Sequence, residues 1–196
     1  MTVSLSKGGS VSLTKEAGSS SLTSLTVGLG WDQSLGIHGN IDLDLSAVLV
    51  GANGRAASEA DLVFYGQGAH VHPSQSVRYS GDNRTGEGDG DDEWITVDLP
   101  AVPALVQAIV FIASIDDPAN LGHSFGGVDA AFIRVVNSSD GRELARFDLT
   151  DGAPTDIALG FGEVYRDGGE WKFQAIGEGY AGGLAAALSN YGIDAA

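Results

Sequence analysis

The residues best suited to chemistry form one dense acidic stretch, Gly81 to Glu93, with the sequence GDNRTGEGDGDDE. It contains six acidic side chains and one arginine in thirteen residues. Like charges this close together repel each other, and the intervening glycines bury no apolar surface that could offset the repulsion. A hard cation removes the repulsion, because Ca²⁺ takes about 6–8 oxygen ligands from carboxylates, carbonyls and water. The stretch therefore predicts a calcium site, and the alternative is a solvated acidic loop without a metal.

Further carboxylates lie at the ends or on one face of predicted strands. In the segment IDLDLS, Asp42 and Asp44 alternate with apolar residues, so they share one face of a strand whose other face belongs to the core. Asp32 ends the strand-like segment LTVGLGWD, and Asp116–Asp117 follow the apolar run VFIASI. A β-sandwich gathers its strand ends at two rims, so we expect these acids to share a rim with the acidic stretch.

Common calcium motifs do not account for the stretch. An EF-hand requires D-x-[DN]-x-[DN]-G followed by a glutamate six positions further on. Starting at Asp82 puts Arg84 in the third position, and starting at Asp89 puts Trp94 where the glycine must stand. The nonapeptides of calcium-bound β-helices come in tandem, whereas the glycine–acid alternation occurs once here. A calcium site in this chain therefore needs a different arrangement of ligands.

The elements that must position these side chains are mostly strands. Short segments of alternating or continuous apolar residues are separated by turn sequences such as Lys7-Gly8-Gly9. This pattern predicts an all-β fold, a β-sandwich of two mostly antiparallel sheets. Helical spacing predicts one short helix near the carboxyl end, over 181–191. The predicted strands are 3–6, 10–14, 25–31, 41–50, 62–65, 76–79, 93–99, 109–115, 131–136, 143–149, 157–165 and 170–176.

Two features bear on the organisation of the chain. The echo VSLSK and VSLTK, Val3–Lys7 and Val11–Lys15, predicts two arms of a hairpin around Gly8-Gly9. No linker or abrupt change in composition interrupts residues 1–196, so we expect a single domain.

Composition excludes several classes of function. The chain has 196 residues, with 10 basic and 26 acidic side chains and a net charge of −16. This charge repels phosphate backbones and anionic lipid headgroups, so we expect neither nucleic-acid binding nor membrane insertion, and we expect cations and basic partners. The absence of cysteine excludes thiol chemistry and leaves oxygen or imidazole as metal ligands. Because no apolar amino-terminal stretch is long enough for a signal peptide, the expected location is cytoplasmic.

Three patterns that suggest catalysis or cofactor binding are better explained as structure. Residues 122–126 fit G-x-S-x-G, but all four histidines precede Ser124, whereas that hydrolase motif needs the order Ser, acid, His. Residues 177–182 fit G-x-G-x-x-G, but only fourteen residues follow, too few for a dinucleotide fold. His70 and His72 have the spacing for a transition metal, although Pro73 favours a loop. We therefore expect no enzymatic activity.

Several motifs, in order along essentially the whole chain, carry a family resemblance. They are VSLSKGG (3–9), VGLGWD (27–32), DLD (42–44), GDNRTGEGDGDDE (81–93), AFIRVVN (131–137), FGEVYR (161–166) and GEWKFQAIGEGYAGGL (169–184). In these motifs the sequence resembles the TerD family of tellurite-resistance and stress-response proteins. The resemblance implies a β-sandwich that binds calcium and has no established catalytic activity.

The resemblance also implies a set of metal ligands in this chain. They are Asp32, Asp42, Asp44, Asp82, Asn83, Asp89, Asp91, Asp92, Glu93 and Asp117. The chain departs from the commoner family pattern at Leu45, where a small residue is typical, and at Asp116, where a histidine is expected. Neither departure removes a carboxylate.

These observations predict a calcium-binding stress-response module associated with tellurite resistance. Calcium is the expected cofactor, and it would order the Gly81–Glu93 loop for interaction with other stress-resistance proteins. One alternative is a calcium-dependent sandwich that binds carbohydrate, which would need a concave face with exposed aromatic side chains. Another is a hydrolase that uses the same carboxylates with Mg²⁺ or Mn²⁺.

Overall fold

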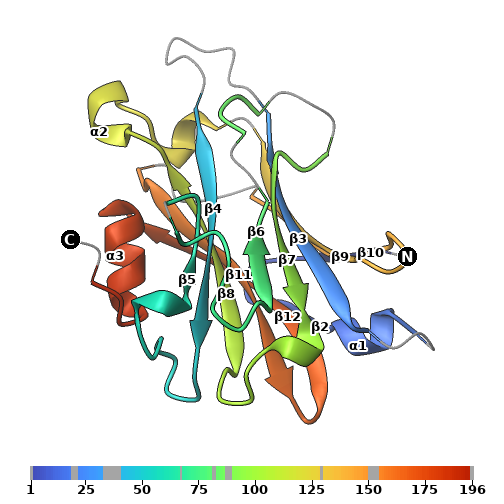
Figure 1. The fold of residues 1–196 in the computed structure, drawn as a ribbon. Helices are drawn as coiled ribbons and strands as arrows, with labels where there is room; N and C mark the ends of the chain where they lie inside the picture. Colours follow the sequence, from blue (N-terminus) through green and yellow to red (C-terminus); the bar gives the residue numbers. More distant parts are fainter. Residues whose placement is uncertain are drawn as a thin grey trace.

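The computed structural model shows two facing β-sheets with short helical turns at their ends (Figure 1). The residues described are 2–18, 22–32, 41–66, 68–80, 83–86, 90–128, 130–149 and 155–194. In the described part of the chain, no helix is long and apolar enough to cross a membrane.

Within the described residues each sheet has six strands, and all the predicted strands are present. Sheet A has the order β1 (Val3–Leu5), β10 (Glu143–Asp148), β9 (Ala131–Asn137), β3 (Ser24–Trp31), β7 (Glu93–Asp98) and β6 (Val77–Tyr79). Sheet B has the order β2 (Ser10–Ser12), β12 (Glu170–Tyr180), β11 (Ala158–Asp167), β8 (Ala108–Ile115), β4 (Leu43–Val50) and β5 (Leu62–Val63). Neighbouring strands are antiparallel except β1 and β10, which are parallel. The predicted sandwich of mostly antiparallel sheets is therefore confirmed.

The core lies between the sheets because alternate residues of each strand point inward. In β3, Leu25, Val27 and Leu29 are fully buried, and the fully buried Phe111 of β8 and Phe161 of β11 belong to the same cluster. The outer face of sheet B is covered as well, by the helix α3 (Gly183–Asn190), which packs against β8 and β11 (Figure 1). The predicted carboxyl-terminal helix is thus confirmed. Its packing explains why β8 is buried on both faces.

The remaining helices are single turns. They are α1 (Leu13–Glu16), α2 (Pro118–Leu121), and the 3₁₀ turns η1 (Glu59–Asp61), η2 (Leu99–Ala101) and η3 (Phe125–Gly127). The turn α1 replaces the end of the strand predicted over 10–14, because the hydroxyl of Ser12 accepts a hydrogen bond from the amide of Lys15 and so starts a helical turn. The fully buried Leu13 side chain holds this turn against the core.

The amino-terminal segment does not form the predicted hairpin. β1 pairs in parallel with β10 in sheet A, whereas β2 pairs with β12 in sheet B. The chain changes sheets at Gly8 and Gly9, whose amide and carbonyl respectively hydrogen-bond the carbonyl and amide of Ala175 at 2.8 and 2.9 Å. The repeated VSL motifs therefore supply one edge strand to each sheet, an outcome that local turn chemistry does not distinguish from a hairpin.

Candidate functional site

The end of β3 and the starts of β4 and β7 lie at one end of the sandwich, the upper end in Figure 1. β3 ends there at Trp31 beside the start of β7 at Glu93, since Leu29 and Glu93 are register partners. β4 starts there beside the end of β8, and the amide of Asp116 donates to the carbonyl of Asp42 at 3.0 Å. We call this end, with Asp32, Asp42, Asp92 and Asp116, the acidic rim, and we call residues 81–93 the acidic loop. The expectation that strand-end acids and the loop share a rim is met for these residues.

Glu93 joins the two sheets beneath the acidic rim. Its side chain is fully buried, and one carboxylate oxygen accepts the amide of Leu45 in β4 at 2.6 Å. The other oxygen accepts the hydroxyl of Tyr79 at 2.7 Å and lies 3.4 Å from the amide nitrogen of Asn83. Donors from both sheets and from the acidic loop therefore meet at one carboxylate, which gives Glu93 a structural role that its place in an acidic run does not reveal.

Asp92 lies at the boundary between the rim and the core. Its two oxygens accept the amide of Trp31 and the side-chain amide of Asn83, each at 3.0 Å. Burial raises the pKa of Asp92 above its usual value, and the charges of Asp91 and Asp32 raise it further, against the lowering effect of the hydrogen bond from Trp31. Asp92 is therefore repelled by neighbouring acids although it is only 7% exposed. A cation at this end would favour its ionised form.

Trp31 supports the first part of the acidic loop. The indole is 3% exposed, and its ring nitrogen donates to the carbonyl of Ile41 at 3.0 Å. Gly86 lies over the indole so closely that a Cβ at this position would stand 2.4 Å from the ring nitrogen. Gly86 also has a φ of +59°, which favours glycine. Trp31 therefore packs in the core and also contacts the acidic loop at Gly86.

Arg84 provides a positive charge at the rim that the sequence did not assign a role. Its guanidinium lies 3.5 Å from a carboxylate oxygen of Asp42 and 3.9 Å from one of Asp116. The side chain is 69% exposed, so these contacts contribute little stability, about 0–1 kcal/mol for surface pairs. They show instead that the carboxylates just before β4 and just after β8 both reach one guanidinium group.

The other predicted ligands are placed less uniformly. Asp44 is 5% exposed within β4, all of whose residues are buried, so its face of the strand is not the open face expected. Asp117 is exposed, with a left-handed backbone at the start of α2. Asp82 and Asp89 lie outside the described residues. Among the residues that the structure describes, no three His, Asp or Glu side chains form a group able to hold a metal ion.

Asp91 points away from the rim acids, toward the outer face of sheet A. Its carboxylate makes a two-point contact with Arg134 of β9, at 2.6 Å to Nε and 3.1 Å to Nη2. Arg134 was not predicted as part of the site. The AFIRVVN motif contains it, but only the register of β3, β7 and β9 places it beside the acidic loop.

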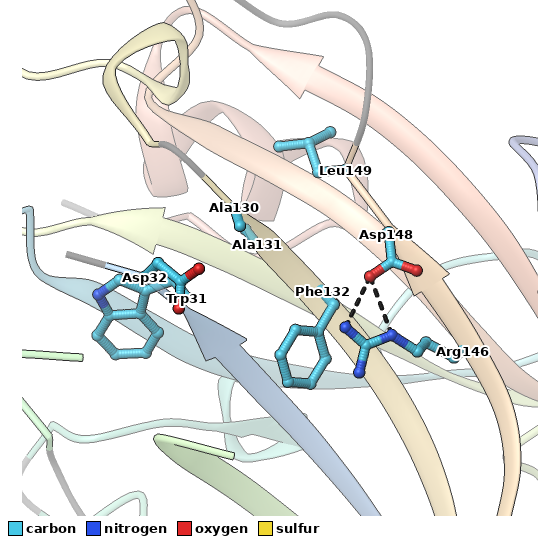
Figure 2. Close-up of a pocket in the computed structure, with 8 residues that line it drawn as sticks. All are labelled: Trp31, Asp32, Ala130, Ala131, Phe132, Arg146, Asp148 and Leu149. Carbon is cyan, nitrogen blue, oxygen red and sulfur yellow. Dashed lines mark hydrogen bonds and ion pairs between the residues drawn. The ribbon is translucent and has the colours of Figure 1, made fainter. Parts of the chain in front are cut away.

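An open cleft of about 570 Å³ lies beside the rim, between the ends of β3, β9 and β10 (Figure 2). Arg146 is fixed in it by contacts of 2.9 and 2.7 Å to one oxygen of Asp148, and its guanidinium carbon lies 3.7 Å from the centre of the Phe132 ring. Asp32 lines the cleft on the other side of Phe132 (Figure 2). The charged side chains that line the cleft are thus one arginine, Arg146, and two acids, Asp32 and Asp148.

The patterns that suggested catalysis are built into local structure. The G-x-S-x-G segment follows α2 and runs into η3, outside any strand–turn–helix unit. The G-x-G-x-x-G segment begins in β12 and ends before α3, and Gly177 there has a φ of +66°. His72 contacts Asp61 at 3.1 Å and Ser74 at 2.7 Å, whereas His70 contacts the carbonyl of Tyr65. The two imidazoles therefore have separate protein partners rather than a shared site.

Fold and rim together define a β-sandwich with a densely acidic end, and comparison with known proteins identifies its family. The family model described as "TerD domain" matches residues 1–191, and the chain belongs to the TerD family. Tellurium resistance protein TerD of Serratia marcescens is 50% identical over 195 residues, covering 100% of both chains. General stress protein 16U of Bacillus subtilis is 45% identical over 194 residues, covering 98% of both. A solved homologue of telluride resistance protein (TerD) from Streptomyces coelicolor superposes with a TM-score of 0.67 at 22% identity, over 89% of this chain and 99% of that one.

Proposed function

We propose that the protein is a calcium-binding stress-response module, associated with tellurite resistance, in which the metal orders the acidic loop for interaction with other stress-resistance proteins. Membership of the TerD family supports the link to stress and tellurium resistance. The proposal includes a cytoplasmic location and no catalytic step.

The observation that carries the calcium part is the environment of Asp92. This carboxylate is buried beside Asp91 and Asp32, and both neighbours raise its pKa, as burial does. Asp42 and Asp116 approach the same rim from sheet B and already share the guanidinium of Arg84. Carboxylate and amide oxygens are the ligands that Ca²⁺ prefers, and a complete site would need ligands in addition to these described acids.

Binding of calcium to the folded state alone would stabilise it. The gain is RT ln(1 + [Ca]/Kd), or about 2.7 kcal/mol when calcium is present at about 100 times Kd. Part of this free energy would go into ordering the acidic loop, in which the side-chain amide of Asn83 donates to Asp92. A partner that recognises the ordered loop would then respond to calcium.

The test is a calorimetric titration of calcium into chelator-stripped protein, with magnesium as a competitor. We expect saturable binding that Asp92→Asn weakens at least about tenfold, or about 1.4 kcal/mol. Asp98→Asn is the matched control, because Asp98 is an exposed acid at the other end of β7. Equal affinity in both variants, or no heat in the wild type, would remove the calcium proposal.

The two alternatives have weaker structural support. Of the large aromatic residues that the described chain exposes, Tyr65 follows β5 of sheet B and Trp94 lies in β7 of sheet A, so they do not form a platform on one sheet face. A metal-assisted hydrolase would be recognised by turnover of a phosphoester panel with Mg²⁺ that Asp42→Asn abolishes. We expect no such turnover.

A further inference from the structure

The second part of the acidic loop is fastened to the outside of sheet A by one ion pair. Asp91 and Arg134 meet through two oxygen–nitrogen contacts, 2.6 and 3.1 Å long, with side chains only 12% and 29% exposed. Two-point contacts between arginine and a carboxylate are among the stronger hydrogen bonds in proteins, and they fix orientation as well as distance. The arrangement is thus more than a transient surface pair.

The backbone of β3 is shaped to receive this carboxylate. Gly28 is the register partner of both Trp94 in β7 and Arg134 in β9, so it lies between them in one row across the sheet. A Cβ at Gly28 would stand 2.1 Å from the carboxyl carbon of Asp91, a distance that no side chain tolerates. The carboxylate therefore occupies the space that a side chain at position 28 would fill.

A second glycine of the same strand receives the loop backbone. A Cβ at Gly30 would stand 2.5 Å from the carbonyl oxygen of Gly90, and also 2.3 Å from the ring of Phe132. The glycines of the VGLG motif thus alternate along β3, and the loop lies directly against both. This contact explains their presence in an otherwise apolar strand better than strand propensity does, since glycine weakens a strand interior.

Arg134 is itself held from the opposite side. Its Nη1 lies 3.1 Å from a carboxylate oxygen of Glu143 at the start of β10. The hydrogen bond with Asp91 and then the contacts with Glu143 raise the pKa of Arg134 against the effect of burial. The guanidinium is accordingly held between β10 and the acidic loop.

We propose that Arg134 is a positioning residue for the acidic loop, and that Asp91 is its anchor rather than a calcium ligand. The clamp holds Gly90 and Asp91 on the outer face of sheet A. It thereby sets the adjacent Asp92 in place against Trp31 and leaves the part around Asn83 to follow the metal. The effect on calcium affinity rests on the proposed function, whereas the clamp itself does not.

The direction in which Arg134→Lys changes calcium affinity distinguishes the two roles of Asp91, anchor or calcium ligand. Arg134→Lys keeps the positive charge but loses the planar fork that matches the carboxylate. If Asp91 is an anchor, the loop of the variant is less well fixed, so part of the free energy of calcium binding is used to order it. Calcium affinity then falls. If Asp91 is a ligand that Arg134 withholds, the weaker lysine contact releases it and calcium affinity rises.

The experiment compares Arg134→Lys, Asp91→Asn and the double variant by calcium titration, at a temperature where each is folded. We expect each single variant to weaken binding about tenfold and the double variant to be no weaker than the weaker single one, since both substitutions break the same contact. Arg142→Lys is the matched control. Arg142 pairs with Asp140 in the turn between β9 and β10, at the other end of these strands, and should leave affinity unchanged. Tighter binding by Arg134→Lys, or unchanged binding by Asp91→Asn, would overturn the proposal.

A second measurement in calcium-free protein tests the clamp without the metal. The amide of Asp92 donates to the carbonyl of Leu29 at 2.8 Å, so its hydrogen exchange reports on the attachment of the loop. We expect Arg134→Lys to speed exchange of this amide about tenfold while core amides of β9 exchange as in the wild type. Unchanged exchange at Asp92 would remove the clamp. If the wild type binds no calcium but the exchange result holds, the proposed function fails and the clamp stands.

Discussion

Replacing Glu93 with glutamine should destabilise the fold strongly although the shape of the side chain hardly changes. The carboxylate is fully buried and accepts the amide of Leu45 and the hydroxyl of Tyr79, at 2.6 and 2.7 Å. Glutamine is neutral and has one acceptor oxygen. When that oxygen keeps the amide of Leu45, the Tyr79 hydroxyl must turn and accept from the NH₂ group. Hydrogen bonds to charged groups contribute about 1.5–3 kcal/mol, and both contacts lose the charge that strengthens them. We expect Glu93→Gln to cost about 2–3 kcal/mol, or about 4–12 °C in Tm for a chain of this length.

The assay is thermal and urea unfolding in the presence of chelator, so that calcium binding does not contribute. Glu170→Gln is the matched control, because its carboxylate pairs with the exposed Lys15 and the substitution should leave stability nearly unchanged. Tyr79→Phe should cost less than Glu93→Gln, and the double variant should be less destabilised than the sum, because the two residues share a hydrogen bond. A Glu93→Gln protein as stable as the wild type would refute the view that this carboxylate joins the two sheets.

Three further outcomes follow from the structure. Gly28→Ala should destabilise the fold by about 1–3 kcal/mol in urea unfolding, because its Cβ would overlap the carboxylate of Asp91; an unchanged midpoint would contradict that packing. Leu188→Ala should cost about 2–4 kcal/mol by the same assay, since this 2% exposed side chain of α3 covers sheet B. Burial raises the pKa of Glu163, so ionisation of this side chain opposes folding. Its contribution to stability is lost as pH rises from the unfolded value of about 4.3 through the raised value of the folded state. In paired thermal scans, the stability of Glu163→Gln relative to the wild type should be greater at pH 7 than at pH 4. A difference that does not change with pH would contradict this prediction.

Much of the fold could be predicted from the sequence because strand periodicity is local. The alternation in AFIRVVN, for example, is the alternation of buried and half-buried residues in β9. Pairing is not local, and the two VSL segments show this. Each has the pattern of an edge strand, but only the bonds from Gly8 and Gly9 to Ala175 determine that they enter different sheets.

The sequence predicted which acidic residues belong to the candidate site, but not what each of them does. The acidic residues of the loop look alike in sequence, yet Glu93 holds the sheets together, Asp92 lies between core and rim, and Asp91 is turned toward Arg134. These differences depend on which donor each carboxylate meets, and the donors come from strands distant in sequence. Arg84 and Arg134 could not be assigned for the same reason, although the glycines of VGLGWD were a signal that something packs against β3.

The most direct test of the central claim, that the acidic rim binds calcium, is to follow the side-chain carboxyl carbon of Asp92 by NMR during a calcium titration of chelator-stripped protein. A calcium site at this rim should give a saturable change at Asp92 that magnesium does not reproduce. The carboxyl carbon of Asp140, which pairs with Arg142 in the turn at the opposite end of the strands, should not change. A resonance of Asp92 that stays fixed while calcium saturates the protein, or that drifts together with Asp140, would contradict a calcium site at this rim.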